Sequence, residues 1–369
     1  APLSERGREQ LLRVLNGGLH LLDVPESELE EYIYANSYLD YLKETLGVDD
    51  PGVLRMARNS GLDWATTGTD LMSIGSAKSC GALGFAPVAV YDEDNPYIHH
   101  FPDGNAGLAR ALVKRLVPKV AEGESAEELV TARFDYEELD RASNVVRIRL
   151  NSTVVHVEHR GEPESAAEVS VKYIQAGEPY QVLGKSVVMA CYNMMIPHIV
   201  SGLPEEQADA LRLQGKSPLQ YTTVGLRNWE AMKERGIGLA MSPGNMHQAV
   251  LMDFPVSMGG YEYSKSPSDP CVLQMISCPY GDTTGAPKLE QYREARGRML
   301  ALQFDDYEEE VRRHLGGMLP KELFEFDRDV ESISVNRWAH GYTTGGPGNS
   351  TRKGRKPFGR IVIANADSA

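Results

Sequence analysis

The chain has 369 residues, of which 41% are hydrophobic and 24% are charged, a composition typical of a globular protein with a large core. Its formal net charge is −14, which disfavours nucleic acid or an anionic membrane as a partner, because phosphate binding requires concentrated Lys and Arg. No run of eighteen apolar residues occurs, which excludes a membrane-spanning helix within the sequence. The four cysteines form no Cys-x-x-Cys pair, so neither a disulfide framework nor a metal site is predicted.

The first third of the chain is predicted to be mainly helical. Apolar residues recur at helical spacing within residues 4–63, for example at Leu29 and Ile33. Residues 64–100 are rich in Gly, Ser and Ala and are predicted to form loops. An amphipathic helix is predicted over 106–117, where Pro118 ends it.

The middle of the chain changes to the pattern of short strands. Strands rich in β-branched residues are predicted over 145–150, 154–157, 169–174 and 186–190. The last of these does not alternate, which predicts a strand buried on both faces. The strands near 150, 187 and 362 are expected to join one buried sheet.

The remaining elements mix helices and strands, which predicts an α/β protein (α+β overall). Helices are predicted over 205–213 and 289–315. Further strands are predicted over 222–226, 249–254, 272–277, 332–338 and 360–364, with a glycine-rich loop at 341–354.

Two common catalytic motifs are missing from the sequence. Gly236-Ile237-Gly238 lacks the third glycine of the Gly-x-Gly-x-x-Gly turn that binds a pyrophosphate, and the glycines at 345–348 follow no strand. No Gly-x-Ser-x-Gly elbow occurs either, so a hydrolase is not supported.

Five segments together resemble the spermidine dehydrogenase-type flavoproteins of the flavin-containing amine oxidase superfamily. They are residues 99–118, 147–159, 186–197, 334–342 and 358–369. The resemblance implies an FAD/NAD(P)-binding Rossmann-like domain assembled from discontinuous segments, with an interleaved substrate domain of mixed sheet and helices. It divides the chain into a helical substrate-side region (1–100), a part of the FAD domain (101–200), a substrate domain (201–335) and a return to the FAD domain (336–369).

The resemblance also implies which residues contact FAD. The main chain of Val154 would lie against the adenine, and Ala190 and Cys191 would approach the cofactor closely because they are small. Asn365 and Asp367 would lie at the final strand-to-helix turn, near the ribityl and pyrophosphate groups. Asp367 is equally suited to capping a helix, and Cys191 is expected to be buried and unreactive.

Three residues of the segment NRWAHGY are implied as catalytic. Trp338 would form a wall beside the flavin, Tyr342 would face the substrate, and His340 would carry a proton. The alternatives are an apolar filler for Trp338 and a hydrogen-bonded structural role for His340. The pairs His99-His100 and Met194-Met195 add non-covalent haem b as a second cofactor hypothesis, against simple packing.

The predicted function is therefore FAD-dependent oxidation of a polyamine-like amine by hydride transfer to the flavin. The sequence shows neither the N-terminal dinucleotide fingerprint nor the C-terminal helix of the family. This raises a second hypothesis, a non-catalytic subunit of the same fold. In either case a homo-oligomer, or a companion chain that supplies the missing segment, is the expected partner. Four cations in the loop, Arg352, Lys353, Arg355 and Lys356, suggest a third hypothesis, a flavin oxidoreductase for a non-cationic substrate. The resemblance is compatible with the periplasm or the cytoplasm.

Overall fold

The computed structural model describes residues 3–61, 67–86, 99–281, 285–343 and 350–368. The chain folds into two compact units. Unit 1 comprises Ala1–Ile98, Lys216–Phe254 and Ser264–Thr344, and unit 2 comprises His99–Gly215, Pro255–Tyr263 and Gly345–Ala369. Helices and strands are mixed, which confirms the predicted α/β class. The assignment of the four predicted segments to cofactor and substrate stays a prediction.

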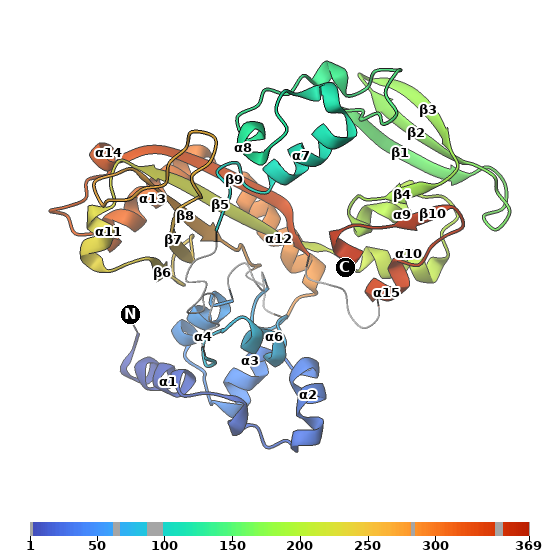
Figure 1. Ribbon diagram of the computed structural model, residues 1–369. Coiled ribbons are helices and arrows are strands. Elements are labelled where there is room, and N and C mark those ends of the chain that lie inside the picture. Colours follow the sequence, from blue (N-terminus) through green and yellow to red (C-terminus); the bar gives the residue numbers. More distant parts are fainter. Residues whose placement is uncertain (1–2, 62–66, 87–98, 282–284, 344–349, 369) are drawn as a thin grey trace. The chain divides into compact units, whose positions relative to one another are not determined.

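The N-terminal part of unit 1 is helical, as predicted (Figure 1). Its short helices pack around a core that contains the fully buried side chains of Tyr38 and Leu42. Within the predicted loop region a helix forms where the Ser73 hydroxyl accepts a hydrogen bond from the Ser76 amide. The elements are α1 (Glu5–Leu15), η1 (Leu19–Leu21), α2 (Glu26–Ala35), α3 (Tyr38–Asp40), η2 (Tyr41–Thr45), α4 (Pro51–Arg58) and α6 (Ile74–Ser79).

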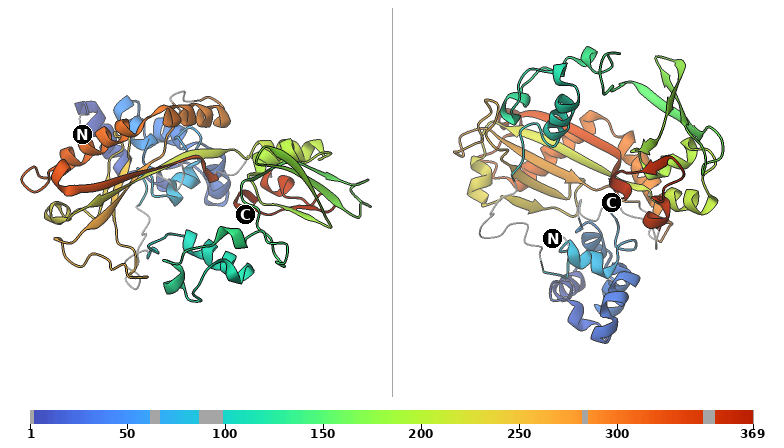
Figure 2. Two further views of the ribbon diagram at one scale, coloured as in Figure 1. Left: turned by 90° about the horizontal axis from the view of Figure 1, so that it is seen from above. Right: turned by 45° about the vertical axis from the view of Figure 1, so that its right-hand side comes forward.

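The rest of unit 1 is built on an antiparallel sheet with the strand order β6-β7-β8-β5-β9. Two long helices lie along one face of this sheet (Figure 2), and Val311 and Leu315 of the second helix share its core. The strands are β5 (Lys216–Leu226), β6 (Leu239–Met241), β7 (Ala249–Asp253), β8 (Cys271–Ser277) and β9 (Val330–Thr343), and the helices are α11 (Glu230–Arg235), α12 (Lys288–Ala301), α13 (Phe304–Met318) and α14 (Phe326–Asp329).

The prediction of one continuous helix over 289–315 is wrong. Leu302 has an extended backbone (ψ 142°), which ends α12. Gln303 then starts α13 in a reciprocal capping box with Asp306. The sequence hides this break because neither Gly nor Pro marks it.

Unit 2 contains two small sheets. The first is an antiparallel meander of β1 (Ser152–His159), β2 (Val169–Gln175) and β3 (Glu178–Gly184), and the second is a parallel pair of β4 (Val187–Met189) and β10 (Ile361–Ile363). The helical elements are α7 (Ala106–Leu116), η3 (Pro118–Val120), α8 (Ala126–Leu129), η4 (Tyr136–Glu138), η5 (Asn193–Met195), α9 (Ile196–Ile199), α10 (Glu205–Arg212), α15 (Ser350–Gly354) and η6 (Ala366–Ser368).

Two predictions about the strands of unit 2 are wrong. The strand near 150 does not join the sheet of β4 and β10, because β1 belongs to the meander; the two sheets share only a core, to which Val157 contributes. Residues 145–150 form no strand, since Arg147 and Arg149 instead turn towards Asp140 in ion pairs.

Strand β4 is not buried on both faces. Met189 is buried, but Val188 is 59% exposed. Among the described residues, no helix has the length and apolar character needed to cross a membrane.

Candidate functional site

The parallel strands β4 and β10 bring distant parts of unit 2 together. Ile361 pairs with Val187 and Ile363 with Met189, so both strands end at the same edge. Beyond that edge, the Ala364 amide donates a hydrogen bond to the Met189 carbonyl (3.1 Å). In open α/β sheets, ligands bind outside the carboxyl ends of such strands. This edge is therefore the candidate cofactor site.

A buried asparagine ties the two strand ends together. The Nδ2 group of Asn193 donates to Gln214 Oε1 (2.7 Å) and to Ser368 Oγ (3.0 Å), and its backbone amide donates to Asp367 Oδ2 (3.0 Å). Asn193 itself is completely buried. The sequence analysis missed this residue, although an asparagine just beyond a buried strand is a recognisable polar signal.

Four of the five predicted cofactor residues lie at this edge. Asn365 Nδ2 donates to the Cys191 carbonyl (2.6 Å) and to Asn193 Oδ1 (2.8 Å), and Ala190 directly follows β4. The Asp367 carboxylate is buried and accepts the Asn193 amide, which fits the capping role. Asn365 Oδ1 is buried without a hydrogen-bond partner, so one acceptor remains for a donor group.

Cys191 is exposed, and the prediction that it is buried is wrong. Partial desolvation of its sulfur, together with the charge of Asp367, raises the pKa of the thiol. Cys191 is therefore a neutral thiol at physiological pH, which agrees with the prediction that it is unreactive.

The outer face of the parallel pair is apolar and open. Val188 and Val362 point away from the core that holds Ile361 and Ile363. Ala364 at the edge is exposed as well. Small side chains of this kind allow a flat ligand to approach the backbone closely.

Val154 lies in the other sheet of unit 2. It pairs with Tyr173 on β2, beside a bulge at Val155, and its side chain is 37% exposed. On the same strand, β1, Val157 forms an isolated parallel bridge with Val200. Both residues belong to the core that β4 and β10 share. Sheet pairing thus does not bring Val154 to the edge where the other four predicted residues meet.

The three predicted catalytic residues lie near the end of β9 in unit 1. Trp338 packs edge-to-face on Tyr221, with ring centroids 5.5 Å apart, and both Trp338 and Tyr342 are exposed. The strand bulges between them, since Trp338 lies opposite Leu219 and Tyr342 opposite Ser217. These exposed aromatic rings can form a wall for a ligand.

The glycine of the motif NRWAHGY is Gly341, and close packing explains why glycine stands there. A Cβ atom at this position would come within 2.7 Å of Leu219 Cβ and 3.1 Å of Trp338 Cβ. The bulge therefore requires glycine, and it sets the spacing between the two exposed aromatic residues.

His340 is half-buried beside α12. Its Nδ1 atom lies 3.5 Å from an Arg296 guanidinium nitrogen. Burial lowers the pKa of His340, and the charges of Arg296 and Lys216 lower it further. The imidazole is thus neutral at pH 7 and able to accept a proton. The sequence analysis missed Lys216, a buried cation at the first position of β5, because no pattern marks it.

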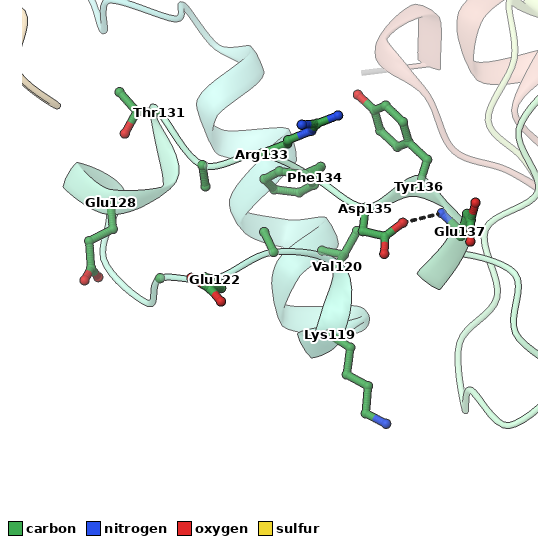
Figure 3. A pocket seen from close by; sticks show the side chains of 13 residues that line it. Lys119, Val120, Glu122, Glu128, Thr131, Arg133, Phe134, Asp135, Tyr136 and Glu137 are labelled. Atoms are coloured by element: carbon green, nitrogen blue, oxygen red, sulfur yellow. Dashed lines mark hydrogen bonds between the residues drawn. The ribbon is translucent and has the colours of Figure 1, made fainter.

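Two hollows lie away from these residues. In unit 2, an open hollow of about 1240 Å³ is lined by residues 119–123, 128 and 131–137 (Figure 3). In unit 1, a cavity of about 380 Å³ has Arg55, Arg58 and Arg298 in its lining, a charge unsuited to an amine cation.

No protein-family model matches the sequence, and no curated protein sequence matches it. Solved structures do match the model over its full length. A double mutant of putrescine oxidase matches with a TM-score of 0.58 at 13% identity, and wild-type putrescine oxidase bound to putrescine matches with 0.56 at 13%, in both cases over 72% of that chain. Cyclohexylamine oxidase from Brevibacterium oxydans matches with 0.50 at 11% identity, over 70% of its length.

The chain has the fold of these amine oxidases. At 11–13% identity this likeness shows the fold alone. Haem gains no support, since His99, His100 and Met195 are exposed.

Two of the four cations that suggested a non-cationic substrate have partners within unit 2. Lys353 Nζ lies 2.7 Å from Glu206 Oε1, and Arg355 donates to the Ser368 carbonyl (2.8 Å). Part of the predicted loop is helix α15, which presents Lys353 to Glu206. Lys353 and Arg355 thus take part in contacts within unit 2, and the hypothesis of a non-cationic substrate stays a prediction.

Proposed function

We propose that this chain binds FAD at the edge formed by β4 and β10 and oxidises an amine. The observation that carries the proposal is the open apolar face at the carboxyl ends of two parallel strands, in a chain with the fold of amine oxidases. The resemblance of five sequence segments to spermidine dehydrogenase-type flavoproteins supports the same cofactor.

The residues at this edge fit part of a flavin nucleotide. Val188 and Val362 supply an apolar surface, and Ala190 leaves the backbone accessible. When bound, FAD supplies the redox chemistry by taking up a hydride equivalent from the substrate.

For β9 we propose the roles that the family resemblance implies. Trp338 and Tyr342 are exposed aromatic residues that would contact the amine through their rings. An alkyl amine is protonated at neutral pH and must lose its proton before oxidation. The resemblance implies His340 as the proton carrier, but burial and the charges of Arg296 and Lys216 lower its pKa, which makes it a weaker base than an ordinary histidine.

A polyamine-like amine is the substrate class that we propose. The matched structures are named for putrescine and cyclohexylamine, and the sequence segments resemble enzymes for spermidine. The net charge of −14 favours the approach of a cation. The four cations of 352–356 do not oppose this, since Lys353 and Arg355 have partners within unit 2.

A non-catalytic subunit is the second candidate function. It is favoured by the hydrogen bond from the Asn193 amide to Asp367 Oδ2, which uses one oxygen of this carboxylate within the chain. On this view the edge of β4 and β10 would contact another polypeptide and not a cofactor.

Activity assays with the FAD-saturated chain separate these candidates. With an artificial electron acceptor, we expect turnover of putrescine, spermidine or cyclohexylamine and none of matched alcohols.

Replacing Trp338 with leucine should lower kcat/KM at least tenfold, because the aromatic contact is lost. The control is Tyr136→Leu, at another exposed aromatic residue, which should leave kcat/KM unchanged. Oxidation of alcohols alone would refute the substrate class, and the absence of both FAD binding and turnover would favour the non-catalytic subunit.

A further inference from the structure

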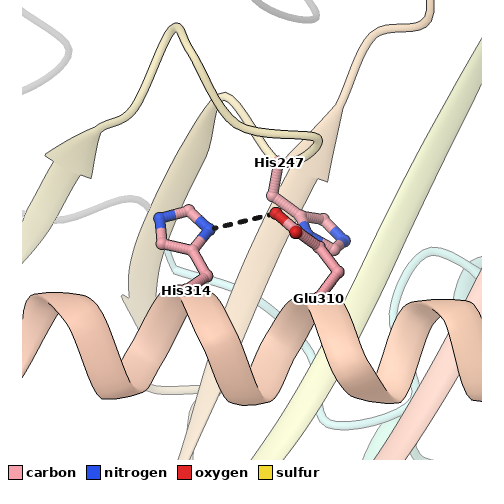
Figure 4. Close-up of side chains that lie close together, drawn as sticks. All are labelled: His247, Glu310 and His314. Atoms are coloured by element: carbon pink, nitrogen blue, oxygen red, sulfur yellow. Dashed lines mark ion pairs between the residues drawn. The ribbon is translucent and has the colours of Figure 1, made fainter.

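A cluster of three buried ionisable residues lies in unit 1, outside the candidate site (Figure 4). His247 precedes β7, while Glu310 and His314 lie one turn apart on α13. Their exposed fractions are 0%, 8% and 4%. One ligand atom from each residue lies within 4.8 Å of those of the other two. Such a group needs an explanation, because burying polar atoms without partners is costly.

Each of the three residues has one buried polar atom without a hydrogen-bond partner. These atoms are His247 Nδ1, His314 Nδ1 and Glu310 Oε1. His314 Nδ1 and Glu310 Oε1 are 4.0 Å apart, which is too far for a hydrogen bond. A bound ion would satisfy three atoms that the protein leaves unsatisfied.

The other polar atom of each side chain is held by a second residue. His314 Nε2 lies 3.0 Å from Ser242 Oγ, and His247 Nε2 lies 2.8 Å from Thr222 Oγ1. Glu310 Oε2 accepts hydrogen bonds from Arg313 Nε (3.0 Å) and from an Arg313 terminal nitrogen (2.6 Å). Metal-binding histidines and carboxylates are oriented by outer partners in this way.

The histidine contacts are compatible with one tautomer for both rings. With the proton on Nε2, each imidazole donates to a hydroxyl oxygen and leaves the lone pair of Nδ1 available. Gln220 Nε2 lies 3.2 Å from His247 Nε2. The same nitrogen donates to Thr222 Oγ1 (3.2 Å), so this amide also belongs to the outer contacts of the cluster.

We propose that His247, Glu310 and His314 bind a divalent transition metal, with Zn²⁺ as the best match. Two imidazole nitrogens and one carboxylate oxygen are a known zinc ligand set, with a water in the fourth position, whereas Ca²⁺ and Mg²⁺ require mainly oxygen ligands. The metal would link α13 to the segment before β7 and so stabilise unit 1.

The protonation state of the cluster agrees with this assignment. Burial lowers the pKa of His247 to about 3, and burial also lowers the pKa of His314 despite the opposing effect of Glu310. Both imidazoles are therefore neutral at pH 7, the form that coordinates a metal. The sequence analysis predicted no metal site because His247 and Glu310 are far apart in the chain and no cysteine takes part.

A cobalt titration of the full chain tests the proposal. After removal of metal with a chelator and dialysis, we expect Co²⁺ to bind with one equivalent per chain and to give visible absorption bands, which Zn²⁺ abolishes. Glu310→Gln and His314→Gln should each lower the affinity at least a hundredfold. His156→Gln should not change it, since His156 forms an exposed pair with Glu158 at 3.2 Å.

Three results would overturn the proposal. They are the absence of Co²⁺ bands in the wild type, equal binding by the wild type and the Glu310→Gln variant, or loss of binding in the His156→Gln variant. Circular dichroism of each variant establishes that it is folded, so lost binding cannot be ascribed to unfolding. The titration requires no FAD, and its outcome is independent of the proposed function.

Discussion

Replacing Asn193 with alanine is expected to lower the free energy of unfolding by about 3 kcal/mol and to weaken FAD binding at the same time. The side chain of Asn193 is the shared partner of Gln214, Asn365 and Ser368, and the residue is completely buried. Its removal leaves buried polar groups unsatisfied, each at a cost of roughly 1–3 kcal/mol. The loss can be measured by urea denaturation followed by circular dichroism.

The matched control for this variant is Asn144→Ala in the same unit. Asn144 is half-buried, and its side-chain amide donates one hydrogen bond, to the Glu138 carbonyl (2.6 Å). Its removal should cost about 1 kcal/mol or less. Equal destabilisation by the two substitutions would show that Asn193 does not organise the strand ends.

Acid is expected to destabilise the metal-free chain through His247. In the folded state this histidine stays neutral down to a pKa of about 3, because it is buried and close to His314. In the unfolded state it takes up a proton below its ordinary pKa of 6.5. The unfolded state therefore binds more protons between pH 6.5 and 3, and stability falls as the pH falls through this window, by up to about 1.4 kcal/mol per pH unit.

The contribution of His247 is isolated by comparison with His247→Gln. Carboxylates also titrate in this range, so the measured quantity is the difference in pH slope between the wild type and the variant, in the presence of a chelator. We expect a shallower slope for the variant than for the wild type. Identical slopes in the wild type and His247→Gln would contradict the assignment of a buried neutral histidine.

Individual helices and strands were predicted from the sequence better than the pairing of the strands. The segment 186–190 was recognised as a strand, but which neighbours it has depends on contacts with β10 far along the chain. Residues 145–150 have the composition of a strand, yet the arginines that alternate with the apolar residues pair with Asp140. Strand β3 was missed because Pro179 and its exposed face are unlike a buried strand.

For the same reason, only part of the candidate site was predicted from the sequence. Cys191 and Asn365 were found through the family resemblance, and the structure places them at one edge. Asn193 and the cluster around His247 were not found, because their significance lies in burial and in contacts across the chain. The spacing of apolar residues shows which face of a single helix or strand is buried. A hydrogen-bonded cluster depends instead on how several elements pack together.

The most direct test of the central claim is an FAD titration of the wild type and of Val188→Glu, followed by the change in flavin fluorescence. Val188 is exposed, so a carboxylate at this position should leave the fold intact while it repels the cofactor and removes apolar contact. Val145→Glu, at another exposed valine of unit 2, is the control. We predict saturable binding by the wild type and the control, and at least tenfold weaker binding by Val188→Glu. Equal affinities for all three proteins, or no binding by the wild type, would contradict an FAD site at the ends of β4 and β10.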